Sequence, residues 1–148
     1  MIDRFEKFSF TISEISRYWH KLASDEMEQH GLKGPQAVYF TTMYQHPNGI
    51  TAVKLAELCS RDKADVSRAV AQFEKKGLVE KVLVNDNFYR APLKLTETGM
   101  KLAERINEKA KAAVANGGKG LTEEQRTIFY NALERICANL RTLTARGL

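Results

Sequence analysis

TAVKLAELCSRDKADVSRAVAQFEKKGLVEK, residues 51–81, is the stretch of sequence that decides the fold. Apolar residues recur at helical spacing over 52–59 and again over 63–76, with only a short connection between the two segments. Thr51 and Asp62 stand where a side-chain oxygen caps the first turn of a helix. Two short helices joined by such a turn are predicted to form a helix-turn-helix.

The inward faces of the two helices follow from the same spacing. One face of each helix gathers the apolar side chains that are predicted to pack in the core: Leu55, Ala56 and Leu58 in the first helix, and Val66, Ala69, Val70 and Phe73 in the second. Gly77 is predicted to end the second helix in a left-handed conformation, which lets Leu78 fold back onto Phe73.

A change of pattern after Gly77 predicts a β-hairpin. The segments 78–84 and 88–95 suit strands, and Asn85-Asp86-Asn87 between them is typical of a turn. Pro92 cannot donate to a ladder of hydrogen bonds, so it must lie at an edge or a bulge. A helix-turn-helix followed directly by a hairpin is a winged helix, and the hairpin is its wing.

Long amphipathic helices are predicted on both sides of the winged helix. The first ends at His30-Gly31, and the last begins at the capping box Thr122–Gln125. Both carry an apolar stripe at heptad-like spacing: Phe5, Phe8, Ile12, Ile15, Trp19 and Leu22 in the first, and Phe129, Leu133, Ile136, Leu140 and Leu143 in the last. The pattern leaves open whether the first stripe packs within one subunit or against a second one.

The predicted fold class is therefore mainly α with a small β-hairpin wing. A chain of 148 residues suits a single domain. Within it, residues 31–97 would form the winged helix, between terminal helices in 1–30 and 98–148. A shorter helix over 36–46 is predicted to begin after Pro35, a residue that suits a first helical position.

The charge of the chain weakly favours a polyanionic partner. Lys and Arg number 23 against 18 Asp and Glu, which gives a net charge of +5. Residues 60–94 alone carry eight cations and five anions, so they hold +3 of that charge. A basic module of this kind is expected to bind nucleic acid.

Several other classes of protein are not expected. No apolar run approaches the ~18 residues of a membrane span, and residues 1–7 lack the apolar core of a signal peptide, so a cytoplasmic location is predicted. Cys59 and Cys137 form no CxxC pair and are not expected to form a disulfide, and Cys59 is predicted to be a small apolar filler. The three histidines lack ligand spacing, so neither a metal nor another cofactor is predicted. No nucleophile, phosphate-loop or metalloprotease motif indicates an enzyme.

The exposed face of the second short helix carries residue types that read DNA bases. An α-helix fits the major groove, where Arg68 can pair with guanine, Gln72 with adenine and Ala64 with a thymine methyl. A solvated helix face is the alternative. With the cations and hydroxyls around it, the predicted DNA-binding set is Thr51, Arg61, Lys63, Ala64, Ser67, Arg68, Gln72, Lys81, Arg90 and Lys94.

Motifs along nearly the whole chain resemble the MarR (multiple antibiotic resistance regulator) family of bacterial transcription factors. The motifs are Gly34-Pro35-Gln36, Leu55-Ala56-Glu57-Leu58, Val66-Ser67-Arg68, Phe73-Glu74-Lys75-Lys76-Gly77-Leu78-Val79, Leu95-Thr96-Glu97-Thr98-Gly99 and Leu121-Thr122-Glu123-Glu124. The motifs at 73–79 and 95–99 are quite specific when they occur together. The chain departs from the family at the wing, where Phe88 replaces an aspartate that usually precedes the wing arginine by two residues.

This resemblance implies a homodimer of winged-helix subunits that regulates transcription. The recognition helix would be 63–76, the wing arginine Arg90, and the target a pseudo-palindromic stretch of double-stranded DNA. The terminal helices would form the dimer interface through Phe5, Phe8, Ile12, Ile15, Leu133, Ile136, Leu140 and Leu143.

The resemblance also implies a small effector. Members of the family often bind small, frequently phenolic ligands, and a repressor released by such a ligand is the expected function. The candidate lining residues are Tyr18, Trp19, Tyr39 and Met43, with ordinary core packing as the alternative. A winged-helix adaptor that binds proteins, without specific DNA binding, is the alternative function.

Overall fold

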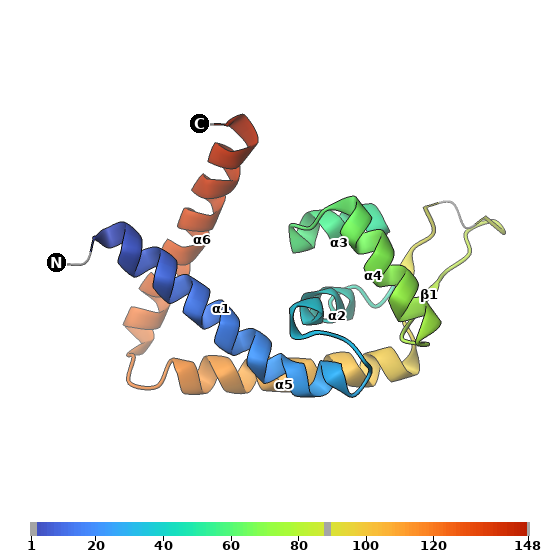
Figure 1. The fold of residues 1–148 in the computed structure, drawn as a ribbon, viewed down its shortest axis with the longest axis horizontal. Coiled ribbons are helices and arrows are strands. Elements are labelled where there is room, and N and C mark those ends of the chain that lie inside the picture. Colours follow the sequence, from blue (N-terminus) through green and yellow to red (C-terminus); the bar gives the residue numbers. More distant parts are fainter. Residues whose placement is uncertain (1–2, 88–89, 148) are drawn as a thin grey trace. The chain divides into compact units, whose positions relative to one another are not determined.

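The computed structural model describes residues 3–87 and 90–147. Phe88, which stands where the resembled family usually has an aspartate, lies outside the described residues. The described elements are α1 (Arg4–Glu28), the short 3₁₀ helix η1 (Gly34–Gln36), α2 (Ala37–Tyr44), α3 (Ala52–Cys59), α4 (Lys63–Lys75), β1 (Val79–Lys81), β2 (Leu93–Leu95), α5 (Glu97–Gly117) and α6 (Glu123–Arg146) (Figure 1). The prediction of a mainly helical winged helix with a small hairpin is confirmed. The chain divides into two compact units, Met1–Lys111 and Ala112–Leu148.

The helix-turn-helix is formed by α3 and α4. The Thr51 hydroxyl accepts a hydrogen bond from the backbone N–H of Lys54 (3.2 Å), which confirms it as the cap of α3. Asp62 occupies the corresponding position before α4, but its side chain makes no capping hydrogen bond, so that part of the prediction is wrong. Its charge still lies at the positive end of the helix dipole.

Left-handed residues end both α4 and α3. After α4, Gly77 has a φ of +71°, and Leu78 N–H donates to the Phe73 carbonyl (2.9 Å), as the sequence predicts. After α3, the same role falls to Ser60, with a φ of 51°. A non-glycine residue in this conformation is uncommon, and the sequence pattern does not predict it.

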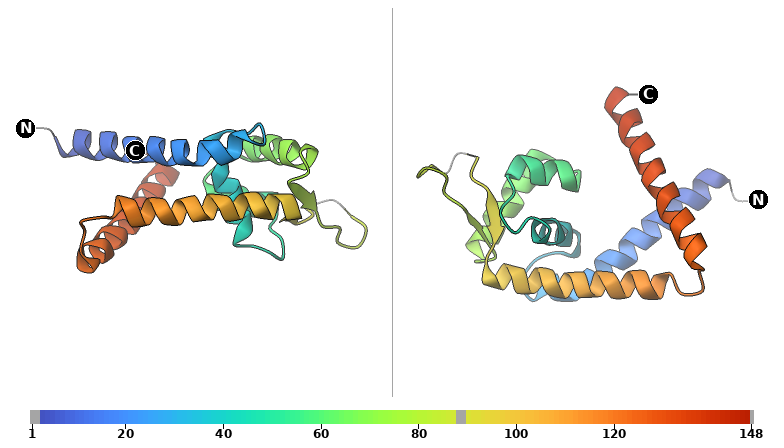
Figure 2. Two further views of the ribbon diagram at one scale, coloured as in Figure 1. Left: turned by 90° about the horizontal axis from the view of Figure 1, so that it is seen from below. Right: turned by 180° about the vertical axis from the view of Figure 1, so that it is seen from behind.

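The wing is shorter than predicted. β1 and β2 pair antiparallel from Val79 opposite Leu95 to Lys81 opposite Leu93, whereas the sequence predicts strands over 78–84 and 88–95. Pro92, directly before β2, has no N–H to donate, so only its carbonyl continues the pairing, by accepting from Val82 N–H (2.8 Å). The hairpin then extends away from the helices of its unit (Figure 2).

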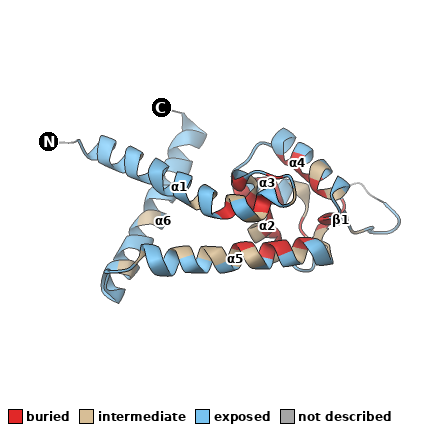
Figure 3. Ribbon diagram, turned by 60° about the horizontal axis from the view of Figure 1, so that its bottom comes forward, coloured by how far each residue is buried: buried red, intermediate tan, exposed pale blue. Residues whose placement is uncertain are grey.

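The core of the first unit gathers under α4. Buried residues lie on α2, α3, α4 and the first part of α5 (Figure 3). The Phe73 ring packs on Phe40 at a centroid distance of 4.7 Å, and both side chains are fully buried. On α3, Cys59 is buried, whereas Leu58 is 47% exposed, so its prediction as a core residue is wrong. Leu58 lies about 100° around the helix from Cys59, outside the buried face.

Gly99 allows α5 to approach the wing closely. A Cβ atom at Gly99 would lie 2.0 Å from the Leu78 carbonyl oxygen. That oxygen is backbone and also accepts a hydrogen bond from Thr96 N–H (3.0 Å), so it cannot move away freely. The beginning of α5 therefore packs against the backbone that connects α4 to β1, by a contact that only glycine permits.

Replacing Gly99 with alanine is expected to lower the free energy of unfolding by about 1–3 kcal/mol or more, because the backbone must shift to admit the methyl group. Urea denaturation at fixed protein concentration measures the effect. Gly117→Ala is the matched control in the same helix, since a Cβ there meets nothing within 4 Å. The control is expected to be neutral or to gain up to about 1 kcal/mol. Equal stabilities for the two variants would contradict the close contact.

The second unit consists of the end of α5, a loop and α6. The predicted capping box is confirmed, because Thr122 Oγ1 accepts from Gln125 N–H (3.1 Å) and Gln125 Oε1 accepts from Thr122 N–H (2.9 Å). None of the described residues of α6 is buried. Among the residues that the structure describes, no helix combines the length and the apolar character that crossing a membrane requires.

Candidate nucleic-acid interface

The outer face of α4 is open and built largely from small side chains. Val66, Ala69, Val70 and Phe73 are buried, as predicted. The opposite face exposes Ala64, Ser67, Arg68, Ala71 and Lys75. Alanine and serine at its centre allow the helix backbone to come close to the floor of a groove, where base edges are read.

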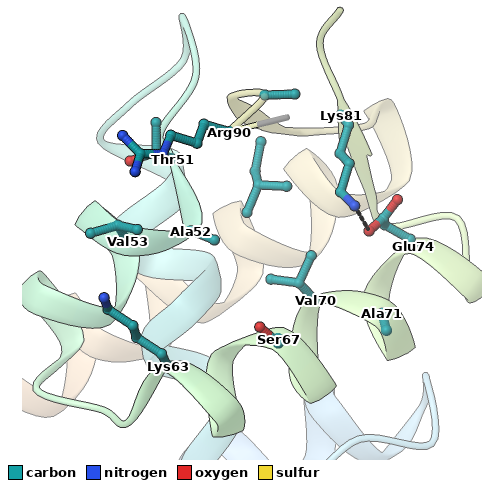
Figure 4. A pocket seen from close by; sticks show the side chains of 12 residues that line it. Thr51, Ala52, Val53, Lys63, Ser67, Val70, Ala71, Glu74, Lys81 and Arg90 are labelled. Carbon is teal, nitrogen blue, oxygen red and sulfur yellow. Dashed lines mark ion pairs between the residues drawn. The ribbon is translucent and has the colours of Figure 1, made fainter. Parts of the chain in front are cut away.

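A groove of about 580 Å³ lies between α4, the start of α3 and the wing (Figure 4). It brings together five of the ten predicted DNA-binding residues: Thr51, Lys63, Ser67, Lys81 and Arg90. Figure 4 shows the Arg90 side chain extending towards the start of α3. We call this feature the wing groove.

The charge of the wing groove is predominantly positive. Lys63, Lys81 and Arg90 contribute three cations, and Glu74 contributes a carboxylate that pairs with the Lys81 ammonium at 3.6 Å. Lys81 and Glu74 are both partly exposed, so water screens their attraction and the pair stabilises the wing only weakly. A groove of this charge favours a phosphate backbone over an apolar or cationic ligand.

A smaller hollow of about 280 Å³ lies along the other side of α4. It contains three more predicted residues, Arg61, Arg68 and Gln72. Arg68 forms an ion pair with Asp65, and Gln72 accepts a hydrogen bond from Gln36 Nε2 (3.2 Å). We call this feature the helix-side hollow.

The two remaining predicted residues lie outside both depressions. Ala64 is exposed on the outer face of α4, and Lys94 is half-buried in β2 opposite Glu80. The single helix α4 thus separates two basic depressions, one on each side. Sequence reasoning missed Gln36 as part of this surface, because only the tertiary packing of η1 beside α4 places it there. It also missed the ion pair of Asp65 with Arg68, although their spacing of three residues signals one.

The four predicted ligand-lining residues lie in different surroundings. Tyr18 is 54% exposed on α1, whereas Met43 is fully buried in the core. Trp19 is partly buried against the core. Tyr39 borders the helix-side hollow, and burial raises the pKa of its hydroxyl above the usual value. Their role in ligand binding stays a prediction.

The two cysteines also differ in their surroundings. Cys59 is buried, and its thiol donates to Thr42 Oγ1 at 3.4 Å. Burial raises the pKa of the Cys59 thiol above its usual value, which disfavours the thiolate. This agrees with the prediction of a small filler. Cys137 is exposed on α6.

The apolar stripes of α1 and α6 are uncovered in the single chain. On α1, the exposed fraction of Phe5, Phe8, Ile12 and Ile15 ranges from 37% to 71%. On α6, Ile136, Leu140 and Leu143 are exposed to 39–46%, and Leu133 is half-buried. Such long rows of apolar side chains mark interaction surfaces rather than ordinary solvent-facing helices.

Comparison with known proteins points to one family. Residues 30–86 match the sequence model of the MarR family. The uncharacterized HTH-type transcriptional regulator YybA of Bacillus subtilis (strain 168) is 26% identical over 129 residues, which cover 87% of this chain and 85% of that protein.

Solved structures agree with this match. A protein from Listeria monocytogenes described as a MarR family transcriptional regulator, in complex with 26mer DNA, superposes with a TM-score of 0.80 at 26% identity, covering 95% of this chain and 90% of that one. An uncharacterized SlyA-like transcription regulator from the same organism gives a TM-score of 0.79 at 27% identity, with the same coverage.

Proposed function

We propose that the chain is a DNA-binding transcriptional regulator of the MarR family that acts as a homodimer and reads a pseudo-palindromic operator. The observation that carries the proposal is the position of α4. Its small-residue face stands between two depressions that hold eight of the ten predicted DNA-binding residues. A helix presented in this way can enter the major groove while cations on both sides meet the phosphates.

Contacts to bases and contacts to phosphates fall to different residues in this proposal. Arg68 on the outer face of α4 donates to guanine O6 and N7, and the methyl group of Ala64 contacts a thymine methyl. Lys63, Lys81 and Arg90 in the wing groove neutralise phosphates, and each phosphate contact releases counterions. Base contacts then set specificity, and phosphate contacts set affinity and orientation.

The homodimer forms through the apolar stripes of the terminal helices. Support for this comes from their exposure in the single chain. A two-fold axis would place two recognition helices in successive major grooves, about 34–36 Å apart. The target is therefore a sequence with two-fold symmetry, and the protein acts in the compartment that holds this DNA, the cytoplasm of a bacterial cell.

Release by an effector completes the proposed cycle. A small, phenolic ligand that binds more tightly to one dimer geometry would change the separation of the two α4 helices and lower DNA affinity by linkage. This part of the proposal, like the assignment of the protein as a repressor, is supported by the family resemblance. No catalytic step is part of it.

Alanine variants of Arg68 and Lys94 are expected to separate specificity from affinity. Arg68→Ala should cost about 1–3 kcal/mol of binding at each half-site and relax the preference at one base pair. Lys94→Ala should weaken binding to all sequences alike and lower the salt slope by about 0.9 for each phosphate that is no longer neutralised. Titration of duplexes selected from random DNA, at several salt concentrations, measures both effects.

Lys119→Ala, which removes an exposed cation from the loop before α6, serves as the charge-matched control. It should bind like the parent. If Arg68→Ala and Lys94→Ala also bound the selected duplex like the parent, the recognition-helix assignment would be wrong. A weak, salt-independent interaction of the parent with DNA would favour a protein-binding adaptor instead.

A further inference from the structure

A side-chain hydrogen bond connects the recognition helix to η1. Gln36 Nε2 donates to Gln72 Oε1 at a distance of 3.2 Å, although the two residues are 36 positions apart in the sequence. Both side chains are half-buried and line the helix-side hollow. Gln72 therefore lies in the helix-side hollow with one end of its amide already hydrogen-bonded.

The direction of this hydrogen bond is determined by a second one. Gln36 Oε1 accepts from the backbone N–H of Lys33 at 3.0 Å. A backbone N–H can only donate, so the amide oxygen of Gln36 must face Lys33 and its nitrogen must face Gln72. The group that Gln72 turns towards η1 is then its oxygen. These three residues form a hydrogen-bond relay with one polarity, from Lys33 through Gln36 to Gln72.

The segment that contains Lys33 and Gln36 is held in place by its packing against α1. At Gly34, the residue between Lys33 and Pro35, a Cβ atom would lie 2.4 Å from the His20 carbonyl oxygen of α1. η1 therefore packs directly on the backbone of α1. Lys33 N–H donates to Gln36 Oε1, and Gln36 N–H donates to the Lys33 carbonyl (3.0 Å). Because both bonds close this packed turn, the amide of Gln36 has a fixed orientation before any DNA is bound.

We propose that, because of this relay, Gln72 presents only hydrogen-bond donors to the DNA and therefore selects guanine in each half-site. The inference rests on the proposed function. Because its oxygen is turned towards Gln36 on η1, Gln72 offers the DNA the two N–H donors of Nε2. Guanine presents two acceptors, O6 and N7, in the major groove. Adenine requires a donor and an acceptor from the same amide. The relay therefore predicts that Gln72 pairs with guanine, whereas the side chain considered alone suggests adenine.

The variant Gln36→Glu tests the relay by reversing it. A carboxylate at position 36 still accepts from Lys33 N–H, but it can only accept from Gln72 as well. Gln72 must then turn its nitrogen towards η1 and its oxygen towards the DNA. The preferred base is expected to change from guanine to one that donates in the major groove, cytosine or adenine, by roughly 10- to 100-fold.

The experiment is selection of bound duplexes from random DNA by the full-length parent and three variants, each first checked for a cooperative thermal unfolding transition. Gln36→Met removes both hydrogen bonds and should broaden the preference at one base pair per half-site without creating a new one. Gln45→Glu, at an exposed position after α2, carries the same added charge and should keep the parent preference.

The outcomes are separable. A new preference at one base pair for Gln36→Glu alone supports the relay. A uniform loss of affinity with unchanged preference assigns Gln72 to a phosphate and overturns its role as a base reader. Unchanged preference and affinity in Gln36→Glu and Gln36→Met overturn the relay while the proposed function stands. A folded parent that enriches no sequence contradicts the proposed function, and the relay with it.

Discussion

Replacing Phe73 with alanine is expected to lower the free energy of unfolding by about 3–5 kcal/mol. The Phe73 ring is fully buried and packs on two other rings, Phe40 at 4.7 Å and Tyr39 at 5.8 Å between centroids. Its backbone carbonyl also accepts the hydrogen bond that ends α4. Alanine would leave a cavity at the point where α2 packs against α4.

Urea denaturation at a fixed protein concentration measures this loss, because the stability of a dimer depends on concentration. Val53→Ala is the control on α3, since Val53 is 51% exposed and its truncation should cost no more than about 0.5 kcal/mol. A Phe73→Ala protein as stable as the parent would show that α4 does not rest on this cluster.

Charges on the α1 stripe are expected to lower the affinity for a full operator by about 10²- to 10⁴-fold. In the double variant Ile12→Asp and Ile15→Asp, two carboxylates replace apolar side chains of the proposed dimer interface. Burial of unpaired carboxylates is costly, so the dimer dissociates. Each subunit then binds one half-site without the gain from a linked second subunit.

Titration of a full operator and of a single half-site, with oligomeric state measured in parallel, gives the result. Phe10→Asp is the matched control, because Phe10 is 70% exposed and lies on the opposite face of the same helix. It should remain dimeric and bind normally. A stripe variant that stays dimeric and retains full affinity would assign the interface to other residues.

Local signals make much of this fold predictable. The cap at Thr51, the left-handed glycine at position 77 and the capping box at Thr122 each depend on residues within one or two turns, and all three occur as expected. The wing is shorter than its residue types suggest, because Val and Leu favour strands whereas Pro92 limits the ladder that they can form. The sequence predicts Leu58 to be a core residue because its side chain is apolar, but it lies outside the buried face of α3 and is exposed.

The interface is predictable in its residue types but not in its hydrogen bonds. Arg68 and the small residues of α4 follow from helical spacing, so their exposure is foreseeable. The bond from Gln36 to Gln72 is not, because it depends on how η1 packs against α1 and beside α4. Interactions between segments far apart in sequence require the tertiary structure, and here they change which base a side chain is expected to read.

Sedimentation equilibrium at micromolar concentration tests the central claim, that two copies of the chain hold two recognition helices in a fixed arrangement. The account predicts a species of twice the 16.8 kDa chain mass, and one such dimer on each selected duplex. A well-folded protein that sediments as a single 16.8 kDa chain, alone and on DNA, would contradict it.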